Sequence, residues 1–543
     1  MQFTFSTSTK LFVFLLIILG LLNFVQAYTT GLLFDEAYYW YYAQQLEWGY
    51  FDHPPMVAWL IACSSFIQGE LGVRLVFIGL YLGSIGLLYH TLQIDTRIKP
   101  LYFLGLLLCF PLFQYYGFLA LPDSPFLFFT ALFFWAYRRF LIQEDYIITF
   151  VLGLSMAGMM YSKYYGFLLI LGVLFSNLSL LKNKKAWLAL ISSFLIYVPH
   201  LMWQIQTDFE SLLFHLNERP NHAYNFSEFT LGYFLNMLTV FGLMGVLIFP
   251  LSIKEPKTDL FKKATSYAAL LVVCFFFLSS FSKKTQAQWF LPIVIPIFLL
   301  TYQSAEHKLK QKKYLRILLL SNIIILGVGR MFLAFENLSP VPLEMHGHSK
   351  WVNALAQKAD NKPVLFKNSY QRASIYQFYS GQKASSLNEI RYRNNQYGLR
   401  GYAEFRSAKD VILVEKTNEK AFDSIAYKDN SLFYLKHLQQ PRIYGKLEWN
   451  FENSILTLQN KHPFSIPLQN FEIKLARLNA YKEFLGVKTV SGFYLQEAII
   501  EPGQTLEVNT RFLQNIEPSP FFKLSLTFDG LPTNIQGLSL KNQ

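Results

Sequence analysis

The stretch TKLFVFLLIILGLLNFVQA, residues 9–27, decides the fold class of this 543-residue chain. It is long and apolar enough to cross the hydrocarbon core of a bilayer, about 30 Å thick, as one helix. Ten similar stretches follow in the first 335 residues, so we expect a polytopic α-helical membrane protein with about eleven transmembrane helices. The expected spans are approximately 9–27, 71–90, 100–119, 124–142, 147–161, 164–181, 187–205, 230–252, 264–281, 289–303 and 315–334.

The composition supports a membrane protein and excludes several other classes. The chain is 52% hydrophobic, 17% aromatic and only 15% charged, which is too apolar for an ordinary soluble domain. The apolar residues occur in blocks, so disorder, collagen and coiled coil are also excluded. The three cysteines, Cys63, Cys109 and Cys274, are widely spaced in apolar stretches, and neither a disulfide framework nor a thiolate metal site is expected.

The net charge of +13 has a better explanation than nucleic-acid binding, for which the chain has no motif. Alternate connections between the expected spans hold 17 Lys and Arg residues, and the opposite short connections hold four. The positive-inside rule therefore predicts a cytoplasmic N-terminus. Residues 10–27 also fit a cleavable signal peptide, but both interpretations place residue 28 outside.

After Arg330 the apolar runs become short and polar residues are dispersed among them. We expect a transmembrane domain over residues 1–335, an extracytoplasmic α/β region over 336–435, and an extracytoplasmic β-rich, sandwich-like domain over 436–543. Within these regions, helices are predicted at Trp351–Ala359 and Arg372–Phe378. Strands are predicted at Pro363–Phe366, Val411–Val414, Ser454–Leu458, Phe471–Leu475 and Phe521–Thr527.

The first outer loop, residues 28–70, contains five carboxylates and no Lys or Arg. Asp35 and Glu36 follow the first span directly, and the aromatic run Tyr38–Tyr42 comes next. Amphipathic aromatic rings settle at the headgroup level of a bilayer. We therefore expect a short helix in that plane, which holds the two carboxylates at the membrane surface.

A second acidic motif, Leu121–Pro125, lies at an outer junction between two spans and contains Asp123. Asp123 or Ser124 can also be read as an ordinary cap of the next helix. Lys163, Lys283 and Lys284 are exceptions to the inside bias, and each alone is better explained as a headgroup anchor. Together with the outer carboxylates, these cations indicate a site that binds an anion beside a general base.

The order of these motifs resembles that of the membrane-embedded C-type glycosyltransferases, in the branch of protein O-mannosyltransferase-like enzymes and the aminoarabinose transferases of lipid A. The resemblance covers the first 300 residues. Its motifs are Phe34–Trp40, Gly49–Met56, Pro122–Pro125, Ser162–Tyr164 and Lys284–Trp289.

The resemblance implies transfer of a sugar from a polyprenyl-phosphate donor, with inversion, at the outer face of the bacterial cytoplasmic (inner) membrane. Asp35 matches the catalytic aspartate of the first loop and Asp123 the second acidic motif, while Lys163 and Lys284 match cations near the donor phosphate. His53 stands where the lipid A enzymes have a lysine, so an imidazole is expected at that phosphate contact. We assign Glu36 and Tyr38 to the acceptor or to support of the first loop.

The chemistry of the residues agrees with this assignment. A carboxylate such as Asp35 can take the proton of an acceptor hydroxyl, and cations can neutralise the departing lipid phosphate. Asp52 with His215 or His222 could hold a divalent metal, but solvated loop histidines are the alternative. The expected partners are the lipid bilayer, a polyprenyl-phosphate-linked sugar, and an envelope lipid, glycan or protein as acceptor, without nucleic acid.

The sequence leaves two other classes of function open. A lipid or polysaccharide transporter or flippase would place ionisable groups near mid-membrane, whereas here the acids collect outside the spans. An envelope scaffold would act through the C-terminal region and has no use for Asp35. In that region, Ser369–Arg372 and Arg391–Tyr397 are either substrate contacts or a solvated basic face.

Overall fold

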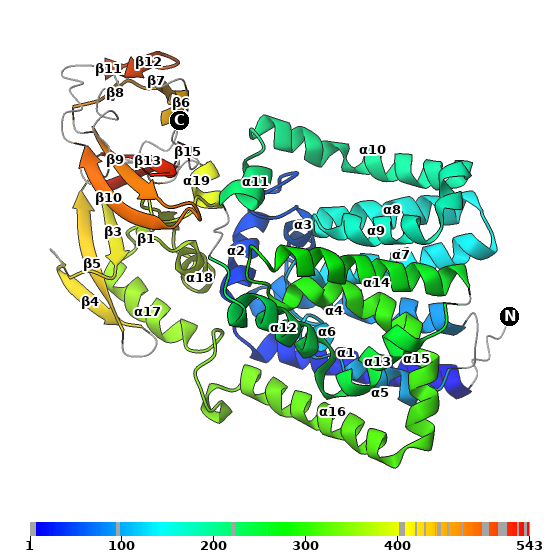
Figure 1. Ribbon diagram of the computed structural model, residues 1–543. Helices are drawn as coiled ribbons and strands as arrows, with labels where there is room; N and C mark the ends of the chain where they lie inside the picture. Colours follow the sequence, from blue (N-terminus) through cyan, green and yellow to red (C-terminus); the bar gives the residue numbers. More distant parts are fainter. Residues whose placement is uncertain are drawn as a thin grey trace. The chain divides into compact units, whose positions relative to one another are not determined.

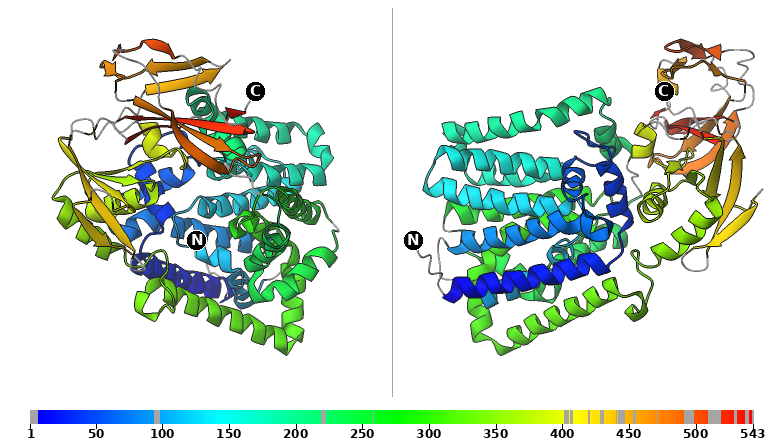
Figure 2. Two further views of the ribbon diagram at one scale, coloured as in Figure 1. Left: turned by 60° about the vertical axis from the view of Figure 1, so that its left-hand side comes forward. Right: turned by 180° about the vertical axis from the view of Figure 1, so that it is seen from behind.

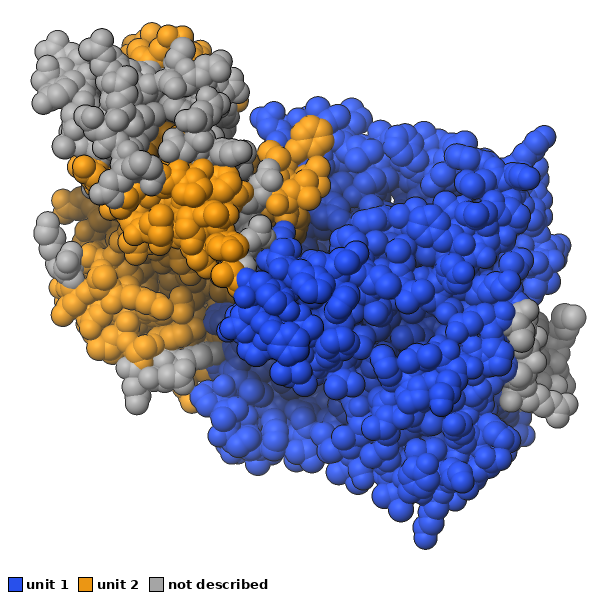
Figure 3. Space-filling model, in the orientation of Figure 1, with its two compact units in different colours: residues 1–208, 224–346 blue, residues 209–223, 347–543 orange. Residues whose placement is uncertain are grey.

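The computed structural model describes residues 7–93, 98–218, 223–257, 259–400, 405, 408–418, 421–427, 431–439, 441, 447–452, 455–469, 471–490, 499–508, 519–528, 531–536 and 540–541. The chain forms two compact units. The first, the membrane unit, contains residues 1–208 and 224–346, and the second contains residues 209–223 and 347–543 (Figure 3). Residues 209–223 thus belong to the second unit, although the sequence-based boundaries place them in the transmembrane domain.

The membrane unit is entirely helical in its described part. Its helices are α1 (Thr7–Thr29), α2 (Phe34–Ala43), α3 (Met56–Cys63), α4 (Gly69–Gln93), α5 (Pro100–Leu108), α6 (Pro111–Tyr115), α7 (Asp123–Ile142), α8 (Tyr146–Ser162), α9 (Gly166–Ser176), η1 (Leu178–Lys182), α10 (Lys184–Gln206), η3 (Ser227–Leu231), α12 (Gly232–Phe241), η4 (Gly242–Met244), α13 (Gly245–Lys254), α14 (Leu260–Ser279), η5 (Ala287–Ile293), α15 (Val294–Gln311), α16 (Lys313–Ala334) and η6 (Glu336–Leu338).

The long helices lie side by side with their axes in one common direction (Figures 1 and 2). Helix α1 packs on α4, α4 on α7, α7 on α8, and α8 on α10, while α14 packs on α9 and α15. Helix α1 ends at the same end of the bundle at which α4 and α7 begin. Helices α2 and α3 lie at that end, which we call the site end.

The expected number of eleven spans is not reached in the described part of the chain. Eight helical segments there are long and apolar enough to cross a membrane, and α8 and α9 are shorter apolar helices. The stretch 100–119, predicted as one span, is broken into α5 and α6. The break precedes Pro111, the first residue of α6, which has no N–H to donate to the preceding turn.

The expected span 230–252 is also interrupted. The structure divides it into α12 and α13 at Gly242, whose φ of +55° is a conformation that favours glycine. A Cβ at Gly242 would lie 2.6 Å from Asn322 Oδ1, so only glycine fits there without a shift of its neighbours. The apolar pattern predicted the length of this segment correctly, but it contained no signal for the break.

The second unit contains an α/β part built on one five-stranded sheet with the strand order β2-β1-β3-β5-β4. Strands β2, β1 and β3 are parallel, and β5 and β4 are antiparallel additions. The helices and strands predicted between residues 351 and 414 correspond to α17, β1, α18 and β3. The elements are α11 (Glu210–Leu213), η2 (Phe214–Glu218), α17 (His348–Ala359), β1 (Val364–Lys367), α18 (Tyr370–Ser380), β2 (Ala384–Leu387), α19 (Gln396–Arg400), β3 (Asp410–Glu415), β4 (Asp423–Ala426) and β5 (Leu432–Gln439).

The rest of the second unit is made of antiparallel strands. One sheet has the order β10-β9-β13-β14, with β15 also paired to β13, and a smaller sheet has the order β12-β7-β6. The three strands predicted here from alternation correspond to β7, β9 and β13, but packing as a sandwich stays a prediction. The strands are β6 (Leu447–Glu452), β7 (Ile455–Asn460), β8 (Ile466–Pro467), β9 (Phe471–Leu478), β10 (Phe484–Val490), β11 (Ile499–Ile500), β12 (Thr505–Val508), β13 (Phe521–Phe528), β14 (Leu531–Gln536) and β15 (Leu540–Lys541).

Candidate active site at the site end of the helix bundle

A buried ion pair between Glu36 and Arg74 organises the site end. The Arg74 guanidinium donates from Nε to Glu36 Oε1 at 2.7 Å and from Nη2 to Glu36 Oε2, and both side chains are completely buried. Arg74 also donates to the backbone oxygens of Ala27, Thr30 and Gly31, so all five of its N–H donors are used. Such a pair is favourable only when hydrogen bonds replace the lost water, as they do here.

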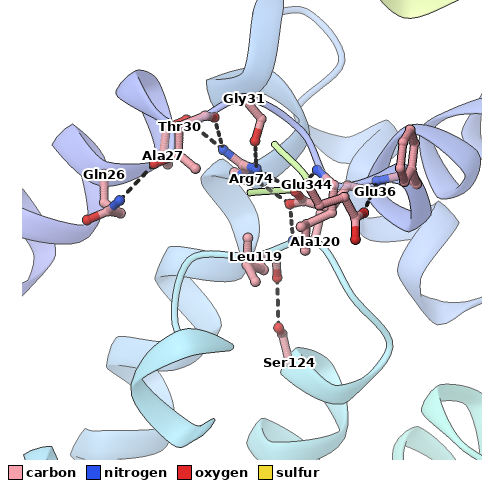
Figure 4. Close-up of polar contacts among 12 residues, drawn as sticks. Gln26, Ala27, Thr30, Gly31, Glu36, Arg74, Leu119, Ala120, Ser124 and Glu344 are labelled. Carbon is pink, nitrogen blue, oxygen red and sulfur yellow. Dashed lines mark hydrogen bonds and ion pairs between the residues drawn. The ribbon is translucent and has the colours of Figure 1, made fainter. Parts of the chain in front are cut away.

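The same pair connects three further parts of the chain (Figure 4). Glu36 accepts from the backbone N–H of Leu33 at 3.0 Å and from that of Ala120 at 2.9 Å. The first bond fixes the beginning of α2, and the second ties α2 to the segment between α6 and α7. Because Arg74 holds the end of α1 as well, the ends of α1, α2, α4 and the α6–α7 connection are locked together.

Asp35 lies next to this locked pair, in the first turn of α2, and its side chain is exposed. The N-terminus of a helix carries partial positive charge, which stabilises a carboxylate at this position. The preceding residue is fixed too, because the Phe34 N–H donates to Glu344 Oε1 at 2.6 Å. The site end thus presents the exposed carboxylate of Asp35 on a backbone that is held on both sides.

Asp123 and Lys163 form a second buried ion pair. The Lys163 ammonium donates to Asp123 Oδ1 at 2.7 Å, and the two side chains are 10% and 5% exposed. Asp123 is the first residue of α7, and Lys163 is the residue that follows α8. No side chain caps α7, since Ser124 Oγ instead donates to the carbonyls of Tyr116 and Leu119. Asp123 and Lys163 are thus partners of each other, while their roles in a reaction stay predictions.

Tyr116, in the connection between α6 and α7, links the two acidic motifs. Its carbonyl accepts a hydrogen bond from Ser124 Oγ at 2.7 Å, and Ala120 of the same connection donates to Glu36. The connection thus lies between Glu36, the neighbour of Asp35, and the beginning of α7, where Asp123 pairs with Lys163.

The aromatic side chains that follow Asp35 in α2 pack against one another and against the rest of the first loop. The buried ring of Tyr38 lies 4.6 Å from Tyr42, which stacks on Tyr50 at 4.3 Å. The Tyr42 hydroxyl donates to Asp52, and burial, followed by the charge of Asp52, raises the Tyr42 pKa well above its usual range. Tyr38 therefore supports the first loop by packing, and Asp52 is held by a tyrosine.

The first loop is also attached to the C-terminal part of α10. His200, which is 1% exposed, contacts the Trp48 carbonyl with Nδ1 at 2.6 Å, and Trp203 donates to Glu47 Oε2 at 3.3 Å. A Cβ at Gly49 would lie 2.2 Å from the Trp203 ring, so glycine is required for this close approach. These contacts fix the loop between α2 and α3.

The other predicted phosphate contacts occupy different positions. His53 packs edge-on against Tyr39 at 5.3 Å, within the first loop. Lys284, between α14 and η5, forms a half-exposed ion pair with Glu228 at 2.5 Å. Its segment approaches the buried pair through aromatic contacts, because Trp289 packs on Phe276, Phe276 on Tyr165, and the Tyr165 ring lies 5.2 Å from the Lys163 ammonium.

The proposed metal ligands receive no support from side-chain clustering. Within the described ranges, no group of three or more His, Cys, Asp or Glu side chains is arranged to hold a metal ion. Asp52 lies in the membrane unit, whereas His215 belongs to the second unit, in η2. His222 lies outside the described residues. A metal at Asp52, His215 and His222 stays a prediction.

Arg74, His200 and Glu344 contribute to the site end, although no sequence motif assigned them a role. Arg74 lies just inside the expected span 71–90. The signal for it was available, because an arginine within an apolar helix is costly unless it faces a partner in the bundle. His200 and Glu344 carried no such signal, since their partners are a backbone carbonyl and a backbone N–H far away in the sequence.

Comparison with known proteins agrees with this geometry. A family model described as dolichyl-phosphate-mannose-protein mannosyltransferase matches residues 52–203. The chain is 40% identical over 63 residues to the lipid A galacturonosyltransferase RgtD of Rhizobium johnstonii. That match covers 10% of this chain and 13% of RgtD, so it spans only a small part of the relative's length.

Two solved structures share the fold over most of the chain. They are ArnT from Cupriavidus metallidurans in the apo state, with a TM-score of 0.57, and the same protein bound to undecaprenyl phosphate, with a TM-score of 0.56. Each is 12% identical and covers 79% of this chain and 97% of the other. The chain therefore has the fold of ArnT, and residues 52–203 match the protein mannosyltransferase model, in agreement with the resemblance indicated by the motifs.

Proposed function

We propose that this chain is an inverting glycosyltransferase, which moves a sugar from a polyprenyl-phosphate donor to a cell-envelope acceptor at the outer face of the cytoplasmic membrane. The observation that carries the proposal is the exposed Asp35 next to the buried Glu36–Arg74 pair, with the cation Lys163 held by Asp123 at the same end of the bundle. The ArnT structure with undecaprenyl phosphate supports a polyprenyl-phosphate donor, and the match to RgtD supports a lipid acceptor.

Asp35 is assigned as the general base. Its carboxylate takes the proton from the acceptor hydroxyl, while the hydroxyl oxygen forms the new bond to the anomeric carbon of the sugar. The bond from that carbon to the phosphate oxygen breaks, and the lipid phosphate leaves with the electron pair. Attack from the side opposite the leaving group inverts the anomeric configuration.

Lys163 is assigned as the cation that neutralises the leaving phosphate. Lys284 and His53 are assigned as further contacts to the same phosphate. The phosphate leaves as an anion, so a cation beside it lowers the barrier without a proton transfer. The bond from Lys163 to Asp123 can be exchanged for a bond to phosphate, because an ammonium is a compact charge with three rotatable donors. Asp123 then holds Lys163 in place before the donor arrives.

The location of the site agrees with a lipid-linked donor. The site end contains α2 and the first loop, while the basic starts of α10 and α16, at Lys184 and Lys313, lie at the opposite end of the bundle (Figure 1). By the positive-inside rule the opposite end is cytoplasmic, so the site end faces outward. There an isoprenoid chain can stay in the bilayer while its phosphate reaches a polar acceptor.

A transporter is the second candidate function. A glycosyltransferase needs the carboxylate of Asp35 as a base, and a transporter does not. A transporter would have to move its substrate past the membrane centre, but the acids assigned here lie at the site end. Asp35 is exposed, so its conservative replacement by Asn separates the two functions.

The test is Asp35→Asn in the full chain, reconstituted with a polyprenyl-phosphate sugar and envelope lipids extracted from the source organism. We expect sugar transfer to fall about 10²–10⁴-fold, the range for loss of a general base. Glu70→Gln, which alters another acid of the same outer stretch, is the control and should retain transfer. Unchanged transfer in the Asp35→Asn protein, with normal insertion, would remove the assignment.

A further inference from the structure

The second unit has a cationic pocket that plays no part in the reaction proposed above. It is a cavity of about 550 Å³, lined by Arg372, Lys416 and a wall formed by Tyr427 and residues 431–434. We propose that this pocket binds an anionic sugar, which is a saccharide unit with a phosphate or a carboxylate. All of these residues belong to the second unit, so the pocket is distinct from the site around Asp35.

The topology of the α/β sheet places the pocket where ligands bind in such folds. In the strand order β2-β1-β3-β5-β4, the connection that follows β1 leads to β2 on one side of β1. The connection that follows β3 leads to β4 and β5 on the opposite side, so the two connections diverge between β1 and β3. The carboxyl ends of two adjacent parallel strands with diverging connections form a crevice that commonly binds ligands. Arg372 lies in the first turn of α18, which follows β1, and Lys416 follows β3 directly.

The charges in the pocket favour an anion. Among the described residues, the lining contains the cations Arg372 and Lys416 and no carboxylate. The Arg372 Nε atom is buried and has no hydrogen-bond partner in the described part of the chain, while Nη1 donates to Ser369 Oγ at 3.3 Å. An unsatisfied buried donor is costly, and an anionic ligand would satisfy it.

The neighbouring charges show that this cationic excess is local. Lys367, at the end of β1, pairs with Glu389 at 2.8 Å and with Glu415 at 3.2 Å, and Lys436 also pairs with Glu415. Every acid in this adjacent network is thus matched by a lysine. The pocket differs from it, since its two cations face the cavity without a described acid.

The wall of the pocket favours a sugar over a bare anion. The Arg372 guanidinium lies 4.9 Å from the Tyr427 ring centre and 5.0 Å from that of Phe433, and these two rings are 4.5 Å apart. This stacking orients the guanidinium rigidly. Tyr427, Tyr434 and the hydroxyl of Ser431 supply the apolar faces and polar groups that orient a small ligand, and the volume lies in the usual range for such sites.

The test is calorimetric titration of the detergent-purified full chain with glucose 1-phosphate, galacturonic acid, glucose and inorganic phosphate. We expect both anionic sugars to bind at least about tenfold more tightly than glucose or phosphate. Lys416→Ala should weaken both about tenfold, the loss of one charged contact. Arg372→Gln should abolish detectable binding.

The matched control is Lys409→Ala, because Lys409 is an exposed lysine just before β3 and Lys416 is one just after it. The control should bind like the unaltered chain, and so should Asp35→Asn, which keeps pocket binding separate from sugar transfer. No binding of either anionic sugar, or equal loss in Lys409→Ala, would overturn the proposal. Phosphate binding as tight as glucose 1-phosphate binding would overturn the assignment of a sugar.

Discussion

The two buried ion pairs of the site end differ in how completely they are enclosed. The Glu36–Arg74 pair has no exposed side-chain surface, and every guanidinium donor has a protein acceptor. The Asp123–Lys163 pair retains some exposure, at 5% and 10%, and its cation is an ammonium rather than a planar fork. The Glu36–Arg74 pair fixes the positions of the helix ends at the site. The Asp123–Lys163 pair holds a cation that can exchange its partner.

This difference separates structural from functional charge in one small region. The planar guanidinium of Arg74 donates to one carboxylate and to three backbone carbonyls at the same time. Removal of any of these partners leaves a buried polar group unsatisfied. Lys163 is a compact point charge beside Asp123, and such a charge can pass from a carboxylate to a phosphate at little cost. We therefore expect substitution of Arg74 to lower mainly the stability of the protein, and substitution of Lys163 to lower mainly the rate of sugar transfer.

Arg74→Met should have the largest effect of these substitutions. It leaves the buried Glu36 carboxylate without its cation, and the free energy of unfolding should fall by about 3–5 kcal/mol. Thermal unfolding in detergent measures this loss. Arg316→Met, at an exposed arginine of α16, is the control and should unfold like the unaltered chain.

The double variant Glu36→Gln with Arg74→Met sharpens the same comparison. With the carboxylate removed, the uncompensated charge disappears, so the double variant should be more stable than Arg74→Met alone. A double variant that unfolds at the same temperature as the single one would show that the lost carbonyl contacts of Arg74, rather than the charge of Glu36, dominate.

Lys163→Arg should have a moderate effect, and on transfer rather than on stability. Asp123 keeps a cation, but the larger guanidinium forms two parallel bonds to a carboxylate and exchanges it for phosphate less readily. We expect transfer to fall about 10–100-fold, mainly through a higher KM for the lipid-linked donor, which is the size of one displaced contact.

Steady-state kinetics with varied donor concentration checks this prediction, and thermal unfolding serves as the second readout. Lys185→Arg, at the opposite end of the bundle, is the matched control. If Lys163→Arg retained full transfer, Lys163 would be a structural partner of Asp123 and the contrast between the two ion pairs would be lost.

Lys284→Gln should have the smallest effect on stability. Its ion pair with Glu228 is half-exposed, and exposed pairs of this kind contribute about 0.2–1 kcal/mol. We expect unfolding to change by less than about 1 kcal/mol in detergent at moderate salt, and the difference to shrink as salt is added. A loss as large as that of Arg74→Met would mean that exposure does not distinguish these ion pairs.

The sequence by itself determined the class of protein, the membrane segments and the motifs of the site. These features are written in continuous stretches, so composition and hydropathy suffice to find them, as the agreement of α1, α4 and α7 with their predicted spans shows. The local signals failed at two places. The apolar pattern continues through both breaks: the one at Pro111 follows from the missing N–H of proline, and the one at Gly242 depends on how the helix meets its neighbours.

Only the tertiary structure decided which charged groups meet. Glu36 and Arg74 are 38 residues apart, Asp123 and Lys163 are 40 apart, and Arg330 reaches Asn23 over 307 residues. Each of these residues carries the same local sequence whether it faces lipid, water or a partner. Its partner is chosen by the packing of distant helices, because only their packing sets the distance between two side chains and removes the water that would otherwise screen them.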